Sequence, residues 1–570
     1  MTTSTAAISA APRLSAWLTF PADATVRVRP GKVEIGQGVL TALAQIAAEE
    51  LDVDLARVRM VAAGTDGGPD EGYTSGSLSI QNSGAALRAV CAEARAIHVD
   101  AAAARWGVPA AELTVRDGRI SAPDGRATSY WEQTDVVLDG PVTGAVAPKP
   151  ESAHRIVGTS AARLDLADKL TGRPRFAHDL AVPGMVYGRV VRPPGRGAEL
   201  VGVDTGPTLA LPGVLTVVRD GSFLGVVAER EETALRAADR LRAAATWTSA
   251  ATLPDEDDLP RFLTTAPART TVLAEEGAPP AEAARTLSAT YHRPYIAHGS
   301  IGPSTATALL SDDMLQVWSH SQGPYPLRAA LAQALAMDPG RVVVRHVEGA
   351  GCYGHNGADD AAMDAALLAT AVPGRAVQVV WSRADEHGWA PLGPAAVVRV
   401  EADVDDRGGV LAWRHEVWGT AHTTRPGSTD GVALLAASHR AGGAEIVARP
   451  EPPGLARGGA AGRNAVAGYA FPAHRVVNHR PHDTPLRTSA LRSLGAFLNV
   501  FAAESFMDEL AAAAGRDPVA YRLDHLADPR ARAVIEAAVR RSGWSAPAES
   551  VGHGIGYARY KNTAAYCAVV

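Results

Sequence analysis

Residues 26–51 read VRVRPGKVEIGQGVLTALAQIAAEEL, a stretch that predicts a strand, a glycine turn and a helix in succession. Residues 26–35 are rich in β-branched side chains, and Gly36-Gln37-Gly38 interrupts them. From residue 39 to 51 apolar residues recur at helical spacing. A helix that begins after such a turn can direct backbone N–H groups at a phosphate or another electron-rich group. An ordinary strand-to-helix turn explains the same letters, so the residues alone leave both interpretations open.

The composition is that of a globular protein with two or three domains, since the 570 residues are 46% hydrophobic and 20% charged. A net charge of −6 argues against nucleic acid as a partner. No apolar run approaches the ~20 residues that span a bilayer. The N-terminus lacks a secretory pattern, so we expect a cytoplasmic chain that meets a membrane only through a partner. Cys91, Cys352 and Cys567 lie too far apart to ligate an iron–sulfur cluster, so electrons would have to leave through another polypeptide.

Two stretches that contain proline and lack periodicity, 139–157 and 252–281, are interpreted as linkers. They divide the chain into segments 1–145, 155–250 and 282–570. Short runs of strand-forming residues alternate with alanine-rich helical segments throughout. This alternation predicts a multidomain fold of the mixed α/β (α+β) class.

A cluster of hydroxyl groups lies at 74–79, TSGSLS, before a helix that we expect to start near Gln81. Hydroxyls in this position usually cap the helix. The same groups suit a polyanion, because each adds a rotatable donor beside the positive end of the helix dipole. Capping and ligand binding both remain open.

Polar and glycine-rich turns follow two predicted strands between residues 315 and 360. The first strand ends in Ser319-His320-Ser321-Gln322, and a helix follows to about Leu335. The second, at 342–347, leads into GAGCYG at 349–354. A buried glutamine at a strand end is most often hydrogen-bonded to nearby backbone, and a glycine turn is most often only a turn. A third turn, LRSLGA, places Arg492 just before a helix predicted over 498–512, where a plain surface arginine is the alternative.

Two other clusters carry chemistry-bearing side chains. His474, His479 and His482 could bind zinc, but no cysteine or carboxylate completes a recognisable ligand spacing. Glu386 and His387 would serve as an acid–base pair if buried, although we expect them to form the polar end of a strand.

Together these segments resemble the large subunit of the xanthine dehydrogenase and aldehyde oxidase family of molybdenum hydroxylases. The 26–51 stretch resembles the family's pterin-contacting segment, and its place at the start of the chain resembles the nicotinate dehydrogenase and isoquinoline 1-oxidoreductase branch. The sequence RLDLADKLTGRPRFAHDLAVPGMVYGRVVRPP at 163–194 resembles the small α/β hammerhead domain. The resemblance implies a pterin/dinucleotide-contacting segment at 1–145, the hammerhead at 155–250 and a molybdenum-cofactor-binding domain at 282–570.

The resemblance also implies roles for particular residues. Gln322 would donate its amide N–H to an oxo group of the molybdenum, Tyr353 and Gly354 would line the metal face, and Arg492 would shape or polarise the site. The family commonly has phenylalanine where Tyr353 stands. No residue is expected to ligate the metal, and Cys352 is expected to be a small core residue. Contacts to the pterin cofactor are expected from Gly36, Gln37, Gly38, Thr74, Ser75, Ser77, Gln322 and Gly354.

The activity implied by the resemblance is hydroxylation of an electron-poor carbon of an N-heterocycle with oxygen from water. The cofactor would be molybdopterin with molybdenum, in the cytosine dinucleotide form, with no iron–sulfur cluster or FAD in this chain. Electrons would leave to a [2Fe-2S] small subunit, with a cytochrome c subunit as a further partner. An aldehyde-oxidising enzyme of the same family and a non-catalytic scaffold chain are the alternatives.

The last five residues, YCAVV, are apolar and prone to form a strand, which predicts a buried strand at the end of the sequence. Family members continue beyond this point and carry their catalytic glutamate there. No segment here matches it, so no catalytic base is assigned, and Glu348 is expected to be structural. Either a separate chain completes the C-terminal domain or this is a truncated product, and we expect little activity without partner chains.

Overall fold

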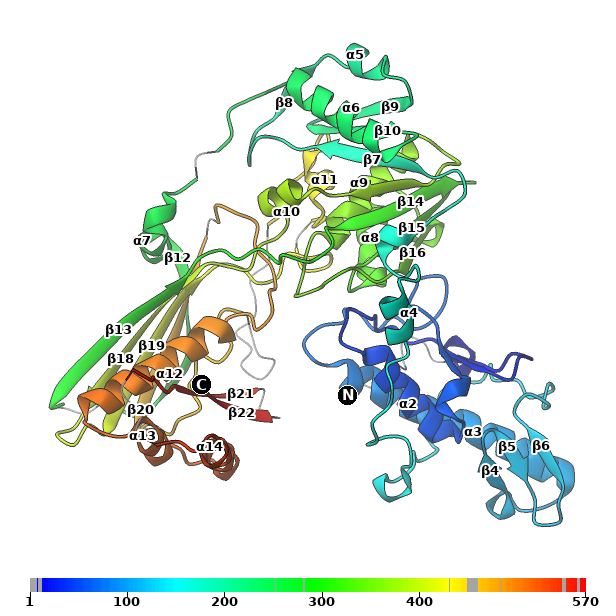
Figure 1. The fold of residues 1–570 in the computed structure, drawn as a ribbon, viewed down its shortest axis with the longest axis horizontal. Coiled ribbons are helices and arrows are strands. Elements are labelled where there is room, and N and C mark those ends of the chain that lie inside the picture. Colours follow the sequence, from blue (N-terminus) through cyan, green and yellow to red (C-terminus); the bar gives the residue numbers. More distant parts are fainter. Residues whose placement is uncertain are drawn as a thin grey trace.

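The computed structural model describes residues 8, 13–251, 253–279, 282–429, 431–447, 460–482, 484–545, 550–560 and 564–570. Residues 252, 280 and 281 of the second predicted linker lie outside these ranges. The described part contains a seven-stranded sheet, a five-stranded sheet and a helical N-terminal region. In Figure 1 the five-stranded sheet and the N-terminal region form two lower lobes beneath the seven-stranded sheet. The predicted multidomain, mixed α/β (α+β) class is confirmed.

The N-terminal region packs two helices on small sheets. Helix α2 covers residues 39–51 as predicted, and its Leu43 packs against Val90 of α3. Strand β2 covers only 26–28, because the next residues bind the 71–74 segment: Val33 N–H donates to Thr74 Oγ1 at 2.9 Å. The elements are β1 (Leu18–Thr19), β2 (Val26–Val28), α2 (Val39–Leu51), β3 (Val58–Met60), α3 (Ala85–Trp106), β4 (Thr114–Arg116), β5 (Arg119–Ser121) and β6 (Ala127–Ser129).

The seven-stranded sheet has the order β16-β15-β14-β17-β7-β10-β9. Its strands are β7 (Val186–Val191), β9 (Val214–Asp220), β10 (Phe223–Ala228), β14 (Thr305–Ser311), β15 (Met314–Ser319), β16 (Val342–His346) and β17 (Val377–Val380). Strands from the predicted 155–250 and 282–570 segments share this sheet, because β17 pairs in parallel with β7. The predicted boundary therefore does not separate two sheets. Beside it, β8 (Leu200–Val203) and β11 (Ala245–Trp247) form a two-stranded sheet.

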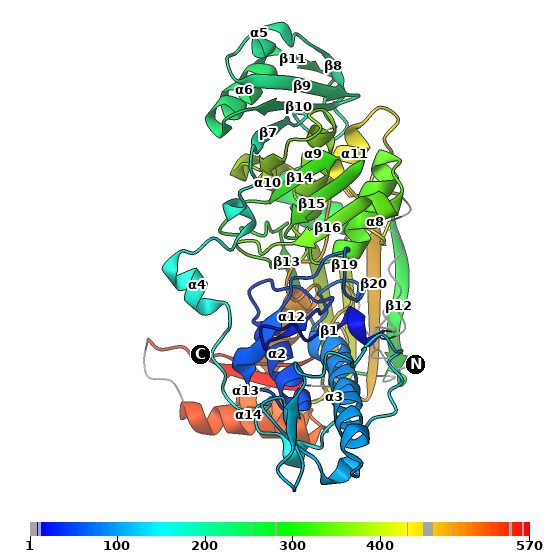
Figure 2. The same cartoon turned by 90° about the vertical axis from the view of Figure 1, so that its right-hand side faces the viewer.

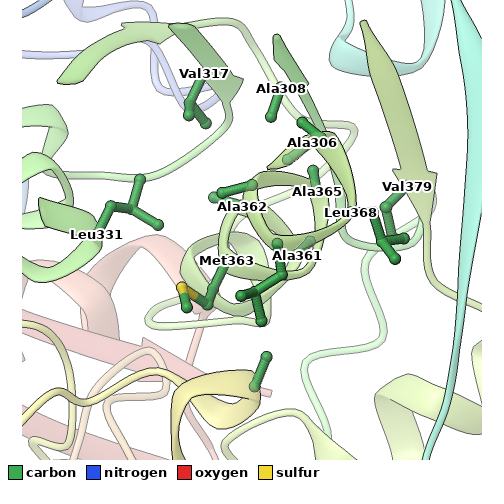
Figure 3. Close-up of a cluster of buried hydrophobic side chains, with 14 of the residues drawn as sticks. Ala306, Ala308, Val317, Leu331, Ala361, Ala362, Met363, Ala365, Leu368 and Val379 are labelled. Atoms are coloured by element: carbon green, nitrogen blue, oxygen red, sulfur yellow. The ribbon is translucent and has the colours of Figure 1, made fainter. Parts of the chain in front are cut away.

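Helix α9 forms the centre of a buried apolar cluster on this sheet (Figure 3). Its small residues Ala361, Ala362 and Ala365 allow it to lie close to Ala306 of β14 and Val317 of β15. The helices of this part are α4 (Leu166–Thr171), α5 (Gly206–Leu209), α6 (Glu231–Ala244), α8 (Pro324–Leu335), α9 (Ala358–Thr370), α10 (Arg383–Trp389) and α11 (Leu435–His439).

The five-stranded sheet has the order β12-β20-β19-β18-β13. Its strands are β12 (Ala268–Glu276), β13 (Arg285–Arg293), β18 (Ala396–Val404), β19 (Val410–Gly419) and β20 (Ala473–Pro481). Helix α12 (Ala496–Ala513) lies along one face, where Phe506 and Leu510 belong to the same buried cluster as Val398 (Figures 1 and 2). Helix α7 (Leu259–Thr265) and β12 both fall within 252–281. The prediction of an irregular linker there is wrong, because Pro260 fits the first turn of α7 and Pro267 and Pro279 lie outside β12.

The C-terminal part contains α13 (Pro518–Asp524), α14 (Pro529–Ser542), β21 (Ile555–Tyr560) and β22 (Ala564–Val569). Strand β22 pairs antiparallel with β21, and Tyr566 and Val570 are 62% and 87% exposed. The prediction of a buried strand is wrong, because alternate side chains of this hairpin face outward. None of the helices in the described ranges has the length and apolar character that a membrane span requires.

Candidate functional site

Three segments far apart in the sequence meet at Thr74. Its N–H donates to the carbonyl oxygen of Gln322 at 2.9 Å, and the Gln322 amide nitrogen donates to the carbonyl oxygen of Thr74 at 2.8 Å. Val33, just before the glycine turn, binds the Thr74 hydroxyl. Gln322 is 9% exposed, so one amide hydrogen is committed to backbone in a buried position. The structure thus brings together the 26–38, 74–79 and 319–322 motifs.

The glycine turn at 36–38 is closed by the neighbouring residue Glu34. Its buried carboxylate accepts hydrogen bonds from the N–H groups of Gly36 at 2.9 Å and Gly38 at 2.8 Å. Gln37 folds back: its Oε1 accepts from Ile35 N–H and its Nε2 donates to Val33 O. In this structure an internal carboxylate therefore occupies the N–H groups of both glycines. Gly36 and Gln37 remain exposed.

The hydroxyl cluster at 74–79 does not cap the following helix. A π-helical turn spans Ile80–Gly84, and neither Ser79 before it nor Gly84 before α3 makes a side-chain cap. Ser75 and Ser77 are exposed, and Ser77 has the left-handed φ of +57° that non-glycine residues seldom adopt. Of the two interpretations of this cluster, capping is thus excluded for the described residues.

The 349–354 turn lies directly against the 490–492 segment. Gly354 forms a backbone bridge with Leu491, and Arg492 N–H donates to Tyr353 O at 2.6 Å. The exposed Arg492 guanidinium lies 5.3 Å from the centre of the Tyr353 ring. Ser493 and Leu494 follow with φ of +74° and +54°, two consecutive strained residues of the kind that cluster at functional sites. Tyr353, Gly354 and Arg492 therefore come together.

A buried Asp359–His355–Ser489 chain beneath this turn was not predicted from the sequence. His355 Nε2 lies 3.1 Å from Asp359 Oδ2, and its Nδ1 lies 2.9 Å from Ser489 Oγ. Burial lowers the pKa of His355. The side chains of His355 and Asp359 are only 4% and 3% exposed, so the chain holds the two turns together rather than meeting a substrate. The spacing of His355 and Asp359, one helical turn apart, was the only local signal; nothing marked Ser489.

The remaining acids and the cysteine near the turn are already engaged. Lys169 and Arg175 bind the Glu348 carboxylate at 2.6 and 2.9 Å. Glu386 accepts hydrogen bonds from the N–H and hydroxyl of Ser304. The Cys352 thiol donates to Gly354 O at 3.4 Å, and burial raises its pKa. In this structure each of the three has a structural contact.

The three histidines considered for zinc lie on or just after β20: His474 and His479 within it and His482 beyond its end. Within the described ranges no three His, Cys, Asp or Glu side chains gather as a metal site.

Two models of the molybdopterin cofactor-binding domain match this chain, over residues 1–145 and 269–443. One component of the nicotinate dehydrogenase of Pseudomonas putida is 36% identical, over 96% of this chain and 46% of the relative. The beta chain of isoquinoline 1-oxidoreductase from Brevundimonas diminuta is 28% identical, over 96% of this chain and 75% of the relative.

Among solved structures, quinoline 2-oxidoreductase from Pseudomonas putida 86 matches with a TM-score of 0.56 at 18% identity. The match covers 70% of this chain and 57% of that one, and at this identity it shows a shared fold. The chain thus spans about half the length of the first relative and of this structure. Because two models of the molybdopterin cofactor-binding domain together match more than half of it, the chain belongs to the molybdenum hydroxylase family.

Proposed function

We propose that this chain is the cofactor-binding part of an oxidoreductase that hydroxylates an electron-poor carbon of an N-heterocycle with oxygen from water. The observation that carries the proposal is that the ends of the neighbouring strands β15 and β16 lead into the Thr74–Gln322 junction and into the 349–354 turn, which lies against residues 490–492. Two relatives, named for nicotinate and isoquinoline, favour an N-heterocycle over an aldehyde. We assign 1–145 and 282–570 as the two cofactor-contacting segments and 155–250 as the hammerhead domain.

The residues at this junction fit an electron-rich cofactor. Ser75 and Ser77 present exposed hydroxyls beside Thr74, and the amide of Gln322 retains one hydrogen beyond the one given to Thr74. Gly354 has no side chain and a φ of +140°, which lets the backbone of Ala490 and Leu491 lie against it and fixes the turn. The glycine turn at 36–38 would contribute its exposed face rather than its occupied N–H groups.

When bound, the cofactor supplies the two-electron oxidation of the substrate carbon. This chain's own residues bind and orient. We assign Gln322 to hydrogen-bond the metal end of the cofactor, the 353–354 turn to line that end, and Arg492 to place positive charge beside the turn. The hydroxyl cluster would hold the phosphates of a cytosine dinucleotide form.

Electrons would leave through separate subunits. Cys91 is fully buried in the N-terminal core, and Cys352 and Cys567 lie in other parts of the structure. We therefore propose a [2Fe-2S] small subunit as the electron acceptor, with a cytochrome c subunit as a further partner.

The test is oxygen-18 labelling by the assembled complex in H₂¹⁸O, with pyridine-3-carboxylate and benzaldehyde as substrates. We expect molybdenum and cytosine nucleotide in the complex, and one labelled oxygen in the hydroxylated heterocycle. Oxidation of benzaldehyde but not of the heterocycle would show that the enzyme oxidises aldehydes. Full molybdenum with turnover of neither substrate would favour the non-catalytic scaffold.

A matched pair of glycine substitutions tests the cofactor loop. Gly38 and Gly107 both adopt left-handed conformations at helix ends, with φ of +77° and +65°. Replacement by valine strains both backbones to a similar degree. Gly38→Val is expected to lower molybdenum content, and Gly107→Val to leave it unchanged; equal molybdenum in both variants would remove the 36–38 turn from the site.

A further inference from the structure

Arg425 differs from the other deeply buried arginines of the described chain. Arg189, Arg192, Arg293, Arg425 and Arg522 are each at most 8% exposed. Four of them have an acidic or carbonyl partner for the guanidinium: Glu231 for Arg189, Asp364 for Arg192, Pro394 O for Arg293 and Glu504 for Arg522. The guanidinium of Arg425 makes no hydrogen bond or ion pair with any residue that the structure describes.

The guanidinium carbon lies 4.5 Å from the centre of the Tyr73 ring. A cation over an aromatic face is only weakly stabilised. Burying a charge without a partner costs more than such a contact supplies, so this contact alone does not offset the burial. The arrangement is that of a cationic group built to receive an anion.

The backbone that carries Arg425 is fixed in place. The Tyr73 hydroxyl donates to Pro426 O at 2.8 Å, and Thr424 N–H donates to Ser489 Oγ at 3.2 Å. Tyr73 adjoins Thr74, and Ser489 belongs to the chain beneath the 349–354 turn. Arg425 is thus held between the Thr74–Gln322 junction and the 349–354 turn.

The titratable groups around Arg425 do not neutralise it. Burial, followed by the charges of His355 and Arg425, lowers the pKa of His298 to about 4, so this ring is neutral at pH 7. The Asp359 carboxylate contributes a favourable field, but it binds His355 and forms no ion pair with Arg425. An oxyanion in contact with the guanidinium would supply the missing partner.

The charged head of Arg425 is also within reach of a ligand. Its nitrogens are not among the polar atoms that are both fully covered and without a partner, whereas Nε and Nη1 of Arg192 are. The 6% of Arg425 that remains exposed therefore includes the guanidinium. A planar guanidinium with free N–H groups matches the two oxygens of a carboxylate.

We propose that Arg425 binds the carboxylate of an anionic aromatic substrate at the site described above. The proposal rests on the proposed function, and it narrows the substrate class to heterocycles that carry an acidic group. A phosphate of the cofactor has the same oxyanion chemistry and is the other source that the experiment must separate.

The experiment compares binding of pyridine-3-carboxylate and of its neutral amide by titration calorimetry, using the purified full chain. Arg425→Gln is expected to weaken binding of the acid by about ten- to a hundredfold and to leave binding of the amide unchanged. Only the acid makes charge-assisted hydrogen bonds to the guanidinium. Arg425→Lys should recover part of the lost affinity, since lysine keeps the positive charge but lacks the paired N–H groups of the guanidinium. Arg328→Gln is the control, because Arg328 lies over the Tyr325 ring at 4.9 Å in the same way.

Molybdenum, phosphate and thermal unfolding are measured on the same samples. If Arg425→Gln loses molybdenum and phosphate, the oxyanion is the cofactor's and the substrate assignment is overturned. Equal affinity of wild type and Arg425→Gln for the acid also overturns it. An unpartnered buried charge predicts an unchanged or higher unfolding temperature in Arg425→Gln, whereas a structural arginine predicts a lower one. Binding of the acid requires no metal, so an assembled complex that lacks molybdenum would refute the proposed function, while the titration would still test Arg425.

Discussion

Gly354→Ala tests whether the 349–354 turn must lie against the backbone of 490–492. A Cβ on Gly354 would overlap Ala490 O and lie 2.7 Å from the Ala490 carbonyl carbon and 3.0 Å from Leu491 Cα. These are backbone atoms, so no side chain can rotate away. The φ of +140° adds strain for any residue other than glycine. Strain and overpacking together cost about 2–6 kcal/mol.

Gly374→Ala is the matched control. Gly374 also has a left-handed φ, +80°, but no atom lies within 4 Å of the Cβ position, so alanine there costs only the strain, about 1 kcal/mol. Thermal unfolding followed by circular dichroism gives the apparent midpoint of each variant. We expect Gly354→Ala to lower the midpoint by several degrees more than Gly374→Ala, and to lower molybdenum content in parallel. Equal midpoints for the two variants would refute the close packing of the two turns.

Three further outcomes are expected. Gln322→Ala should lower kcat by roughly ten- to a hundredfold at normal molybdenum content, since it removes an amide hydrogen bond to a group that gains charge; an unchanged kcat removes Gln322 from the site. Ser489→Ala should cost about 1–3 kcal/mol in denaturant unfolding, because it leaves His355 and a backbone N–H without their partner. Burial lowers the pKa of His415 to about 4, below its unfolded value of about 6.5. The stability this group provides is present above pH ~6.5 and is lost as the pH falls toward 4, by up to about 3 kcal/mol, so His415→Gln should flatten the acid limb of a stability–pH curve.

The elements with strong local signals could be predicted from the sequence. Helix α2 follows from its apolar spacing, and the turns after β15 and β16 follow from glycine and polar residues at strand ends. The apolar residues of β22 led to a wrong prediction of a buried strand, because an exposed hairpin strand and a buried strand can have the same composition. The prolines of 252–281 led to the prediction of a linker where strand β12 lies. They stand before and after this strand, and they do not determine the structure of the residues between them.

Contacts between distant residues could not be predicted. Ser489 lies 134 residues from His355, and no local pattern links them. Glu34 is only two residues from Gly36, yet whether its carboxylate turns inward depends on burial that distant segments provide. Arg425 belongs to no sequence motif. It is significant because no described residue supplies an acidic or carbonyl partner for its guanidinium.

The position of the N-terminal region on the sheet determines whether a site exists. The outer edge of β16 is paired with residues 63–65: His346 N–H donates to Ala63 O and Thr65 N–H to Val344 O, each at 2.9 Å. The His346 ring lies between Ser321 O and Glu34 O, at 3.0 and 2.9 Å. An exposed strand edge is thereby covered. The same contacts fix Thr74 beside Gln322, so the N-terminal segment is as much a part of the site as the strand ends it covers. A substitution that loosens this edge should therefore disturb the Thr74–Gln322 junction without touching either residue.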